Sequence, residues 1–261
     1  MYPFRAREDV EFLILAGGKG SRYDKTEKVL IGKEETFKNA KLTVRLNGKS
    51  LPQHALEFAV NNGARRVHVT LGHGSESKQI KADLEFSAAM NAIALVTRTQ
   101  DITTYGTGAA LLPWQEYTMA PLVVLFGDNF YQGDLPQFPD LDTLYFTCST
   151  ALDLQTSFAQ HPGTILSKRY AAVLDDRIIE KPHNIINGPF FTGLLHLPYG
   201  FLHEFAPNVS PRGEMEITES ANAWPKRAAI PLTETSMIWG DLTYQTDVKH
   251  LQTLIASSSL R

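Results

Sequence analysis

The chain has 261 residues, 43% of them hydrophobic, so it can bury a substantial core as one large domain or as a domain with a small lobe. Its formal net charge of −3 leaves no electrostatic footprint for nucleic acid or an anionic membrane. The single cysteine, Cys148, lies in an apolar run and is expected in the core, without an internal disulfide. No apolar run approaches transmembrane length and residues 1–9 lack a signal-peptide core, so the expected location is the cytoplasm.

Short apolar runs alternate with helix-like patterns along the chain, which favours an α/β fold with a mostly parallel sheet. Strands are expected at residues 11–16, 66–71, 92–97, 122–126 and 144–149. Helices are expected between them, at residues 51–61, 76–90 and 107–116, and a last one at residues 246–256. The sequence shows no hexapeptide repeat of the kind that builds a parallel β-helix.

A glycine-rich segment follows the first expected strand and ends on a cation, Arg22. Glycines have no side chains, so their backbone N–H groups can close around an anion while the arginine supplies a forked positive charge. The segment therefore predicts a phosphate-binding loop. Its spacing matches neither the dinucleotide fingerprint nor a Walker loop.

This segment, LAGGKGSR at residues 15–22, resembles the LAGGxGTR signature of sugar-1-phosphate nucleotidylyltransferases, with Ser21 in place of threonine. That family joins a nucleoside triphosphate to a sugar phosphate and releases pyrophosphate. The resemblance implies a catalytic role for Arg22. It also implies nucleotide contacts from the preceding residues, namely Ala16, Gly17, Gly18, Gly20 and Ser21.

The fold implied by the resemblance is a Rossmann-like, GT-A-like α/β nucleotidyltransferase sheet flanked by helices, with a small sugar-binding lobe. The whole chain, residues 1–261, is expected to form one such domain. Its nucleotide-binding half would cover about residues 10–150 and its sugar-phosphate-binding half about residues 151–261.

A second matching segment follows the third expected strand. Gln100 leads into Gly106-Thr107-Gly108, which resembles the family's Q…GT(A/G) segment, where the glutamine and the glycine backbone meet the edge of the nucleobase. The same residues are equally consistent with a loop in which Thr107 caps a helix, and both interpretations can hold together.

Two carboxylates follow apolar runs, Asp128 in Gly127-Asp128-Asn129 and Asp241 in Trp239-Gly240-Asp241. In open α/β sheets ligands gather beyond the carboxyl ends of the strands, where two carboxylates can hold Mg²⁺ against substrate phosphates. In the family that the chain resembles, the matching residues are metal ligands. The family's second motif reads W-x-D-x-G, and Thr243 stands in place of its glycine.

Contacts to the sugar phosphate are implied by three further matches. Glu180-Lys181-Pro182 matches the family's E-K-P, in which the lysine pairs with the phosphate and the glutamate meets a sugar hydroxyl. Thr192-Gly193 resembles its T-G segment, and residues 212–219, RGEMEITE, are similar to its R-G-E-x-E-I-T-D. With these, the resemblance covers nearly the whole chain in order.

The family also has a phosphate-contacting lysine after the arginine, and both Lys28 and Lys41 are candidates. The spacing of the residues downstream favours Lys41, which implies an insertion in the loop. Residues 19–49 carry nine Lys or Arg against four Asp or Glu, a local cationic patch that suits a triphosphate.

The resemblance therefore implies an enzyme of nucleotide-sugar and polysaccharide biosynthesis. It would condense dTTP or UTP with a sugar 1-phosphate by Mg²⁺-dependent in-line attack, with Arg22, Lys41 and Lys181 as the catalytic cations. The sequence leaves self-association, the sugar and the choice between dTTP and UTP open. Three alternatives remain: a sugar transferase using Asp140-Leu141-Asp142 as an Asp-x-Asp metal motif, a catalytically silent paralogue, and a nucleotidylyltransferase for a non-sugar phosphate such as phosphocholine.

Overall fold

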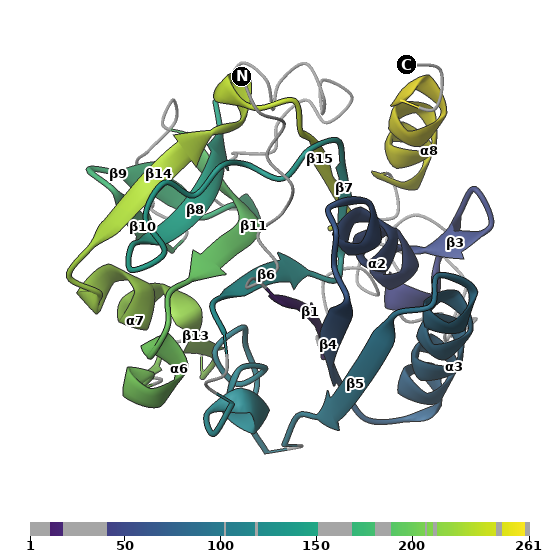
Figure 1. Cartoon of the computed structure of the whole chain (residues 1–261), viewed down its shortest axis with the longest axis horizontal. Helices are drawn as coiled ribbons and strands as arrows, with labels where there is room; N and C mark the ends of the chain where they lie inside the picture. The colour runs from purple at the N-terminus through teal and green to yellow at the C-terminus, as the bar shows by residue number, and fades with distance from the viewer. Residues whose placement is uncertain are drawn as a thin grey trace, which may run out of the picture.

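A nine-stranded β-sheet runs through the part of the chain that the structure describes (Figure 1). The structure, a computed structural model, describes residues 11–17, 41–101, 103–117, 120–150, 169–180, 189–206, 208–210, 213–243 and 247–258. The strands of the sheet are, in chain order, β1 (Glu11–Ala16), β4 (Arg66–Leu71), β5 (Ala94–Thr99), β6 (Leu122–Phe126), β8 (Leu144–Ser149), β9 (Ala172–Leu174), β10 (Arg177–Ile179), β11 (Phe190–Leu197) and β14 (Arg227–Pro231).

Four of these strands form a parallel block in the order β6-β1-β4-β5. β11 joins the block antiparallel to β6, and on its other side pairs with β8, which in turn runs parallel to β14. The remaining described strands form three two-stranded antiparallel ladders. In these, β2 (Arg45–Leu46) pairs with β3 (Lys49–Ser50), β7 (Asn129–Gln132) with β15 (Ile238–Asp241), and β12 (Asn208–Val209) with β13 (Met215–Glu216). The predicted α/β class with a mostly parallel central sheet is thus confirmed.

The central strands read as continuous apolar runs because both faces of the sheet are buried. In β1, Phe12 and Ile14 pack into the core on one face, while Leu13 and Leu15 pack into the core on the other. The helices are α2 (Leu51–Asn61), α3 (Ser75–Met90), α6 (Phe201–Glu204), α7 (Ile217–Ala223) and α8 (Asp247–Ser258). α2 and α3 cover the first face, and α6 and α7 cover the second (Figure 1).

α8 covers the β7–β15 ladder at one end of the molecule (Figure 1). Leu251 and Ile255 on the helix pack with Phe130 of β7 and with Leu242, which follows β15, in a small separate core. This packing fixes the position of Asp241 at the end of β15.

Four predicted elements differ from the structure. α3 begins one residue earlier than expected, at Ser75, and α8 ends two residues later, at Ser258. The strand expected at residues 92–97 is β5, Ala94–Thr99, because Ala92 has a φ of 52° and belongs to the turn that closes α3. The helix expected at residues 107–116 is wrong: the segment forms turns and a short 3-10 helix, Leu112–Trp114. Pro113 cannot donate a helical hydrogen bond, and tertiary contacts to β13 fix the backbone of Gly108. Predictions for β1, β4, β6, β8 and α2 match the structure residue for residue.

A bulge in β11 brings residues 192–194 toward the end of β6. The pairing register with β8 shifts between Phe191 and Leu195, and Gly193 within the bulge has a φ of +77°. A Cβ atom at Gly193 would lie 2.5 Å from Asn129 Nδ2 and 2.9 Å from the Phe126 ring. The bulge therefore requires glycine both for its backbone conformation and for space.

Gly193→Ala should destabilise the fold more than Gly200→Ala. Both glycines have positive φ, but a Cβ at Gly200 would meet nothing within 4 Å. Gly200→Ala, the control, should lower the free energy of unfolding by about 1–2 kcal/mol from backbone strain alone. Gly193→Ala should lower it by a further amount of about 1–3 kcal/mol from overpacking. Urea denaturation measures both losses, and equal losses would contradict the close approach of the bulge to Asn129.

Candidate active site

A cavity of about 490 Å³ opens at the carboxyl ends of the parallel strands. Its walls come from the segments that follow β1, β5 and β6, and from the β11 bulge and the end of β15. Because parallel strands end at the same edge of a sheet, these distant segments meet there.

Ten of the residues predicted from sequence line this cavity. They are Gly17, Lys41, Gln100, Gly106, Thr107, Asp128, Glu180, Thr192, Gly193 and Asp241. Ala16 instead is buried within β1, opposite Leu71 of β4. The remaining predicted residues, Gly18, Gly20, Ser21, Arg22 and Lys181, lie outside the described residues, as does Lys28.

Gln100 lies at the end of the cavity that the motifs assign to the nucleobase. Its Nε2 donates to the carbonyl of Thr104 at 2.7 Å, and its Oε1 lies against the bare Cα of Gly17, where any side chain would collide with it. The hydrogen bond from Gln100 Nε2 to the Thr104 carbonyl thus fixes the plane of the Gln100 carboxamide. A larger residue at position 17 would therefore displace the Gln100 carboxamide from this position.

Residues 105–108 are hydrogen-bonded to β13. These bonds connect the cavity wall that follows β5 to the wall formed by β13 and the start of α7. The N–H of Met215 donates to the carbonyl of Tyr105 at 2.6 Å, and the N–H of Gly108 donates to the carbonyl of Met215 at 2.9 Å. The Thr107 hydroxyl accepts from the N–H of Ile217 at 3.1 Å and so caps α7. Thr107 therefore does cap a helix, but the helix is α7 and not the one expected at residues 107–116.

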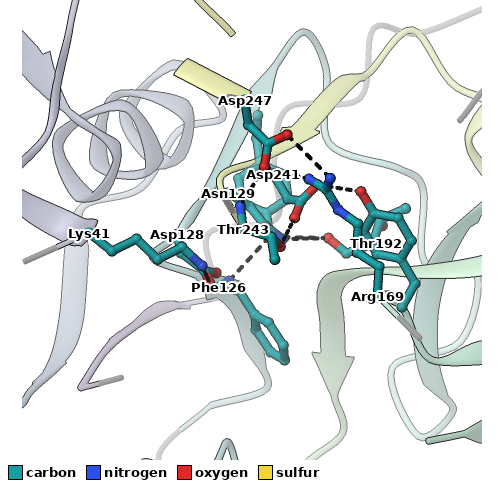
Figure 2. A network of polar contacts seen from close by, with 11 residues as sticks. Lys41, Phe126, Asp128, Asn129, Arg169, Thr192, Asp241, Thr243 and Asp247 are labelled. Carbon is teal, nitrogen blue, oxygen red and sulfur yellow. Dashed lines mark hydrogen bonds and ion pairs between the residues drawn. The ribbon is translucent and has the colours of Figure 1, made fainter. Parts of the chain in front are cut away.

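The two predicted metal ligands are brought side by side by the β7–β15 ladder (Figure 2). Asp241 pairs with Asn129, the neighbour of Asp128, and the N–H of Leu242 donates to the Asp128 carbonyl at 3.0 Å. The Asp128 side chain is 37% exposed and forms an ion pair with Lys41, whereas the Asp241 side chain is 8% exposed. Lys41 thus lies in the cavity beside the predicted metal site.

Asp241 is held by a buried polar cluster that sequence reasoning missed (Figure 2). Its Oδ1 accepts from Arg169 Nη2 at 2.8 Å and from the Tyr170 hydroxyl at 2.5 Å, and its Oδ2 accepts from the Thr243 hydroxyl. Burial alone would raise the pKa of Asp241, but the Arg169 guanidinium and the two hydroxyls outweigh it and hold the pKa below its usual value. Asp241 is therefore a carboxylate at neutral pH.

Arg169 is itself anchored by Asp247, in the first turn of α8. Nη1 and Nη2 donate to the two carboxylate oxygens of Asp247 at 3.2 and 2.7 Å. Neither Arg169 nor Asp247 is part of a recognisable motif. The one signal near them is Thr243, which departs from the family's glycine and supplies the hydroxyl on Asp241.

The β11 bulge is fixed by groups from β7. Asn129 Nδ2 donates to the carbonyl of Thr192 at 2.8 Å, and the Tyr131 hydroxyl donates to the carbonyl of Gly193 at 2.9 Å. The Thr192 hydroxyl is hydrogen-bonded to that of Thr147. The wall assigned to the sugar phosphate is thus attached to the same ladder as the carboxylates.

The donor set fits one divalent cation if substrate supplies the other ligands. Among the described residues, no group of three or more His, Cys, Asp or Glu side chains could hold a metal by itself. Counting the described residues, Asp241 Oδ2 keeps one acceptor direction, and Asp128 Oδ1 accepts no hydrogen bond. Two carboxylate oxygens can then combine with phosphate oxygens and water around Mg²⁺.

Other candidate residues lie away from this chemistry. Asp140 accepts from the N–H of Asp142 and the hydroxyl of Thr143, both at 2.9 Å, so the Asp-x-Asp segment forms a local turn. Within the described part of the chain, it contributes nothing to the cavity wall.

Cys148 is buried, as predicted, and burial raises the pKa of its thiol to about 11. None of the described helices combines the length and apolar character needed to span a membrane.

The chain is similar in sequence to sugar-1-phosphate nucleotidylyltransferases. It is 26% identical over 238 residues to a bifunctional sugar-1-phosphate nucleotidylyltransferase/acetyltransferase of Sulfurisphaera tokodaii, covering 88% of this chain and 51% of that protein. It is 21% identical over 248 residues to the bifunctional protein GlmU of Methanococcus maripaludis, covering 92% and 53%. The chain thus spans about half the length of these curated relatives. No family model matches it.

Solved structures show the same fold. A Bacillus anthracis protein named as a glucose-1-phosphate thymidylyltransferase, crystallised with sucrose, superposes with a TM-score of 0.69 at 19% identity, covering 94% of each chain. UDP-glucose pyrophosphorylase complexed with UDP-glucose gives 0.67 at 15% identity, covering 96% of this chain and 99% of that one. The inositol-1-phosphate CTP transferase of T. maritima gives 0.66 at 13% identity, covering 98% and 97%. The predicted fold and the resemblance to nucleotidylyltransferases are confirmed.

Proposed function

We propose that this chain is a sugar-phosphate nucleotidylyltransferase, which condenses a nucleoside triphosphate with a sugar 1-phosphate and releases pyrophosphate. The observation that carries the proposal is the gathering of ten residues, predicted from separate motifs, around one cavity. The sequence similarity to named nucleotidylyltransferases supports it.

The proposed reaction needs no protein nucleophile. A phosphate oxygen of the sugar phosphate attacks the α-phosphorus, and the bond from that phosphorus to the departing pyrophosphate breaks in line. The protein brings two polyanions together, so its cations and N–H groups have the main catalytic task. Lys41 would hold phosphate from within the described cavity, with Arg22 and Lys181 supplying further charge.

Asp128 and Asp241 are the proposed ligands of Mg²⁺. When bound there, the ion would neutralise phosphate charge as a Lewis acid. Asp128 would exchange its ion pair with Lys41 for the metal, which would free the ammonium group for phosphate. The exposure of Asp128 makes this exchange sterically simple.

The proposed acceptor site lies between the β11 bulge and Glu180. Glu180 would accept from a sugar hydroxyl, and Thr192 and Gly193 would border the ring. Phosphocholine remains the alternative acceptor, and a pyrophosphate-release screen separates the two. We expect release with sugar 1-phosphates such as glucose 1-phosphate, and release with phosphocholine alone would overturn the assignment of the acceptor.

Asp128→Asn should abolish pyrophosphate release while leaving the fold intact, because it removes the charge of the proposed metal ligand but keeps its shape. Asp142→Asn is the matched control, since Asp142 is an exposed carboxylate of the Asp-x-Asp turn. Initial rates with Mg²⁺ and thermal unfolding are measured for both. Full turnover by Asp128→Asn contradicts the metal assignment, and an equal loss of turnover in Asp142→Asn would show that the effect is not specific to the cavity.

Lys41→Ala should lower kcat/KM by at least about 30-fold, equivalent to about 2 kcal/mol of transition-state stabilisation. Lys28→Ala, in the segment interpreted as an insertion, should lower it much less. Both variants are assayed with the same substrates at several concentrations. If Lys28→Ala had the larger effect, Lys28 would be the phosphate-binding lysine and the insertion would follow it.

The nucleotide preference should be for dTTP or UTP over GTP, ATP and CTP. The Gln100 carboxamide presents a donor and an acceptor together, which suits the N3–H and a carbonyl of thymine or uracil. Gln100→Ala should weaken the preference, since a site built to hydrogen-bond its ligand rejects analogues that leave buried groups unpaired. Initial rates at equal triphosphate concentrations test this, and a clear preference for CTP or a purine would refute the base assignment.

A further inference from the structure

The Thr107 hydroxyl is used within the protein, on the wall formed by β13 and α7. It donates to Glu216 Oε2 at 3.2 Å and accepts from the N–H of Ile217 at 3.1 Å. A hydroxyl carries a single proton, and Thr107 gives that proton to Glu216. Thr107 lines the cavity on the loop expected to meet the base, yet it keeps no second proton for a nucleotide.

This arrangement decides where the Glu216 side chain lies. Glu216 is the N-cap residue of α7, a position whose side chain commonly accepts hydrogen bonds from the first N–H groups of its own helix. The Glu216 side chain makes no such bond. The Thr107 hydroxyl takes the N–H of Ile217 instead, and Glu216 lines the cavity. The carboxylate is thus held on the cavity wall by a residue from a different segment.

The wall that carries Glu216 leads to the proposed acceptor site (Figure 1). Asn222 of α7 forms two hydrogen bonds with the backbone of Ile178 in β10. Its Nδ2 donates to the Ile178 carbonyl at 2.7 Å, and its Oδ1 accepts from the Ile178 N–H at 2.8 Å. Glu180, the proposed contact of a sugar hydroxyl, directly follows β10 and lines the same cavity. α7 therefore connects Glu216 to the strand that positions Glu180.

Carboxylates are the shared feature of this side of the cavity, which is lined by Glu180, Glu214 and Glu216. A carboxylate has about four acceptor sites on its two oxygens, so Glu216 can hold the Thr107 hydroxyl and accept from a ligand at the same time. A sugar ring offers many hydroxyl donors to such a wall. A phosphate chain offers acceptors and negative charge, which carboxylates repel.

We propose that Thr107 is a positioning residue for the acceptor, because its hydroxyl holds Glu216 in the cavity. Glu216 is then a further specificity-determining residue, which accepts a hydrogen bond from a sugar hydroxyl. Thr107 thereby acts on the acceptor and not on the nucleotide that its loop is expected to contact. This inference rests on the proposed function in taking the acceptor to be a sugar 1-phosphate.

The test is the KM of each substrate for pyrophosphate release by the full chain. The acceptor probes are glucose, galactose and glucosamine 1-phosphates, and the one that the wild type uses best is kept for all variants. Thr107→Val preserves the shape of the side chain but removes the hydroxyl. It should raise the acceptor KM at least about tenfold, because a hydrogen bond to a charged group is lost. The triphosphate KM should change less than about twofold, and kcat less than about threefold.

Thr107→Ser is the rescue variant, since it keeps the hydroxyl. Its two KM values should stay within about threefold of the wild type. Ser220→Ala is the control for α7 itself, because Ser220 donates to the Ala206 carbonyl at 3.1 Å and does not line the cavity. Loss of that bond should leave both KM values unchanged. A Ser220→Ala variant with the same rise in acceptor KM as Thr107→Val would overturn the inference.

Glu216→Ala separates the carboxylate from the helix cap. It keeps the hydrogen bond between Thr107 and the Ile217 N–H, so it also carries the prediction should Thr107→Val fail to fold. Its acceptor KM should rise at least about tenfold. The double variant Thr107→Val/Glu216→Ala should be no worse than the worse single variant, because both substitutions remove the same contact. Additive effects would overturn the inference.

Failure of this inference is distinguishable from failure of the proposed function, because wild-type release is measured first. An unchanged acceptor KM in Glu216→Ala, or a larger rise in the triphosphate KM than in the acceptor KM of Thr107→Val, would overturn the inference alone. Wild-type release with phosphocholine, or with none of the three sugar phosphates, would overturn the proposed acceptor and the inference together.

Discussion

The antiparallel pairing of β15 with β7 is the contact on which the candidate active site depends. It aligns Asp241 with Asn129, more than a hundred residues earlier, and so places the second carboxylate beside the turn that carries Asp128. The same ladder supplies Asn129 and Tyr131, which hold the carbonyls of the β11 bulge. One short ladder thus positions both carboxylates and one wall of the cavity.

The β7–β15 ladder is stabilised on both of its faces. The apolar residues of α8 bury its outer face, and a Cβ at Gly240 would lie 2.6 Å from the side chain of Leu251. On the inner side, Arg169 balances the charge of Asp241, whose burial would otherwise be costly. Apolar packing and ion pairing therefore stabilise the same four-residue strand from opposite sides.

The sequence predicts the parallel strands well because their length and register follow from apolar runs buried on both faces. It predicts the segment after Gly106 badly, because the local helical pattern there yields to hydrogen bonds with β13, a strand more than a hundred residues away. The same distinction applies to the site. Asp128 and Gln100 stand in recognisable segments at strand ends, whereas Arg169 and Asp247 acquire their role from a pairing between residues 78 positions apart. No periodicity or short motif encodes such a pair.

The attachment of residues 105–108 to β13 has a consequence for how this cavity could change during evolution or engineering. A Cβ atom at Gly106 would collide with the backbone of Met215, and one at Gly108 would lie 3.1 Å from the backbone of Glu216, so the two segments are in close backbone contact. Lengthening or reshaping the loop to admit a larger base would displace Glu216 and the start of α7. Under the proposed function, the segment expected to meet the base and the segment expected to border the sugar pocket would therefore move together, and a variant altered in one would need compensating changes in the other.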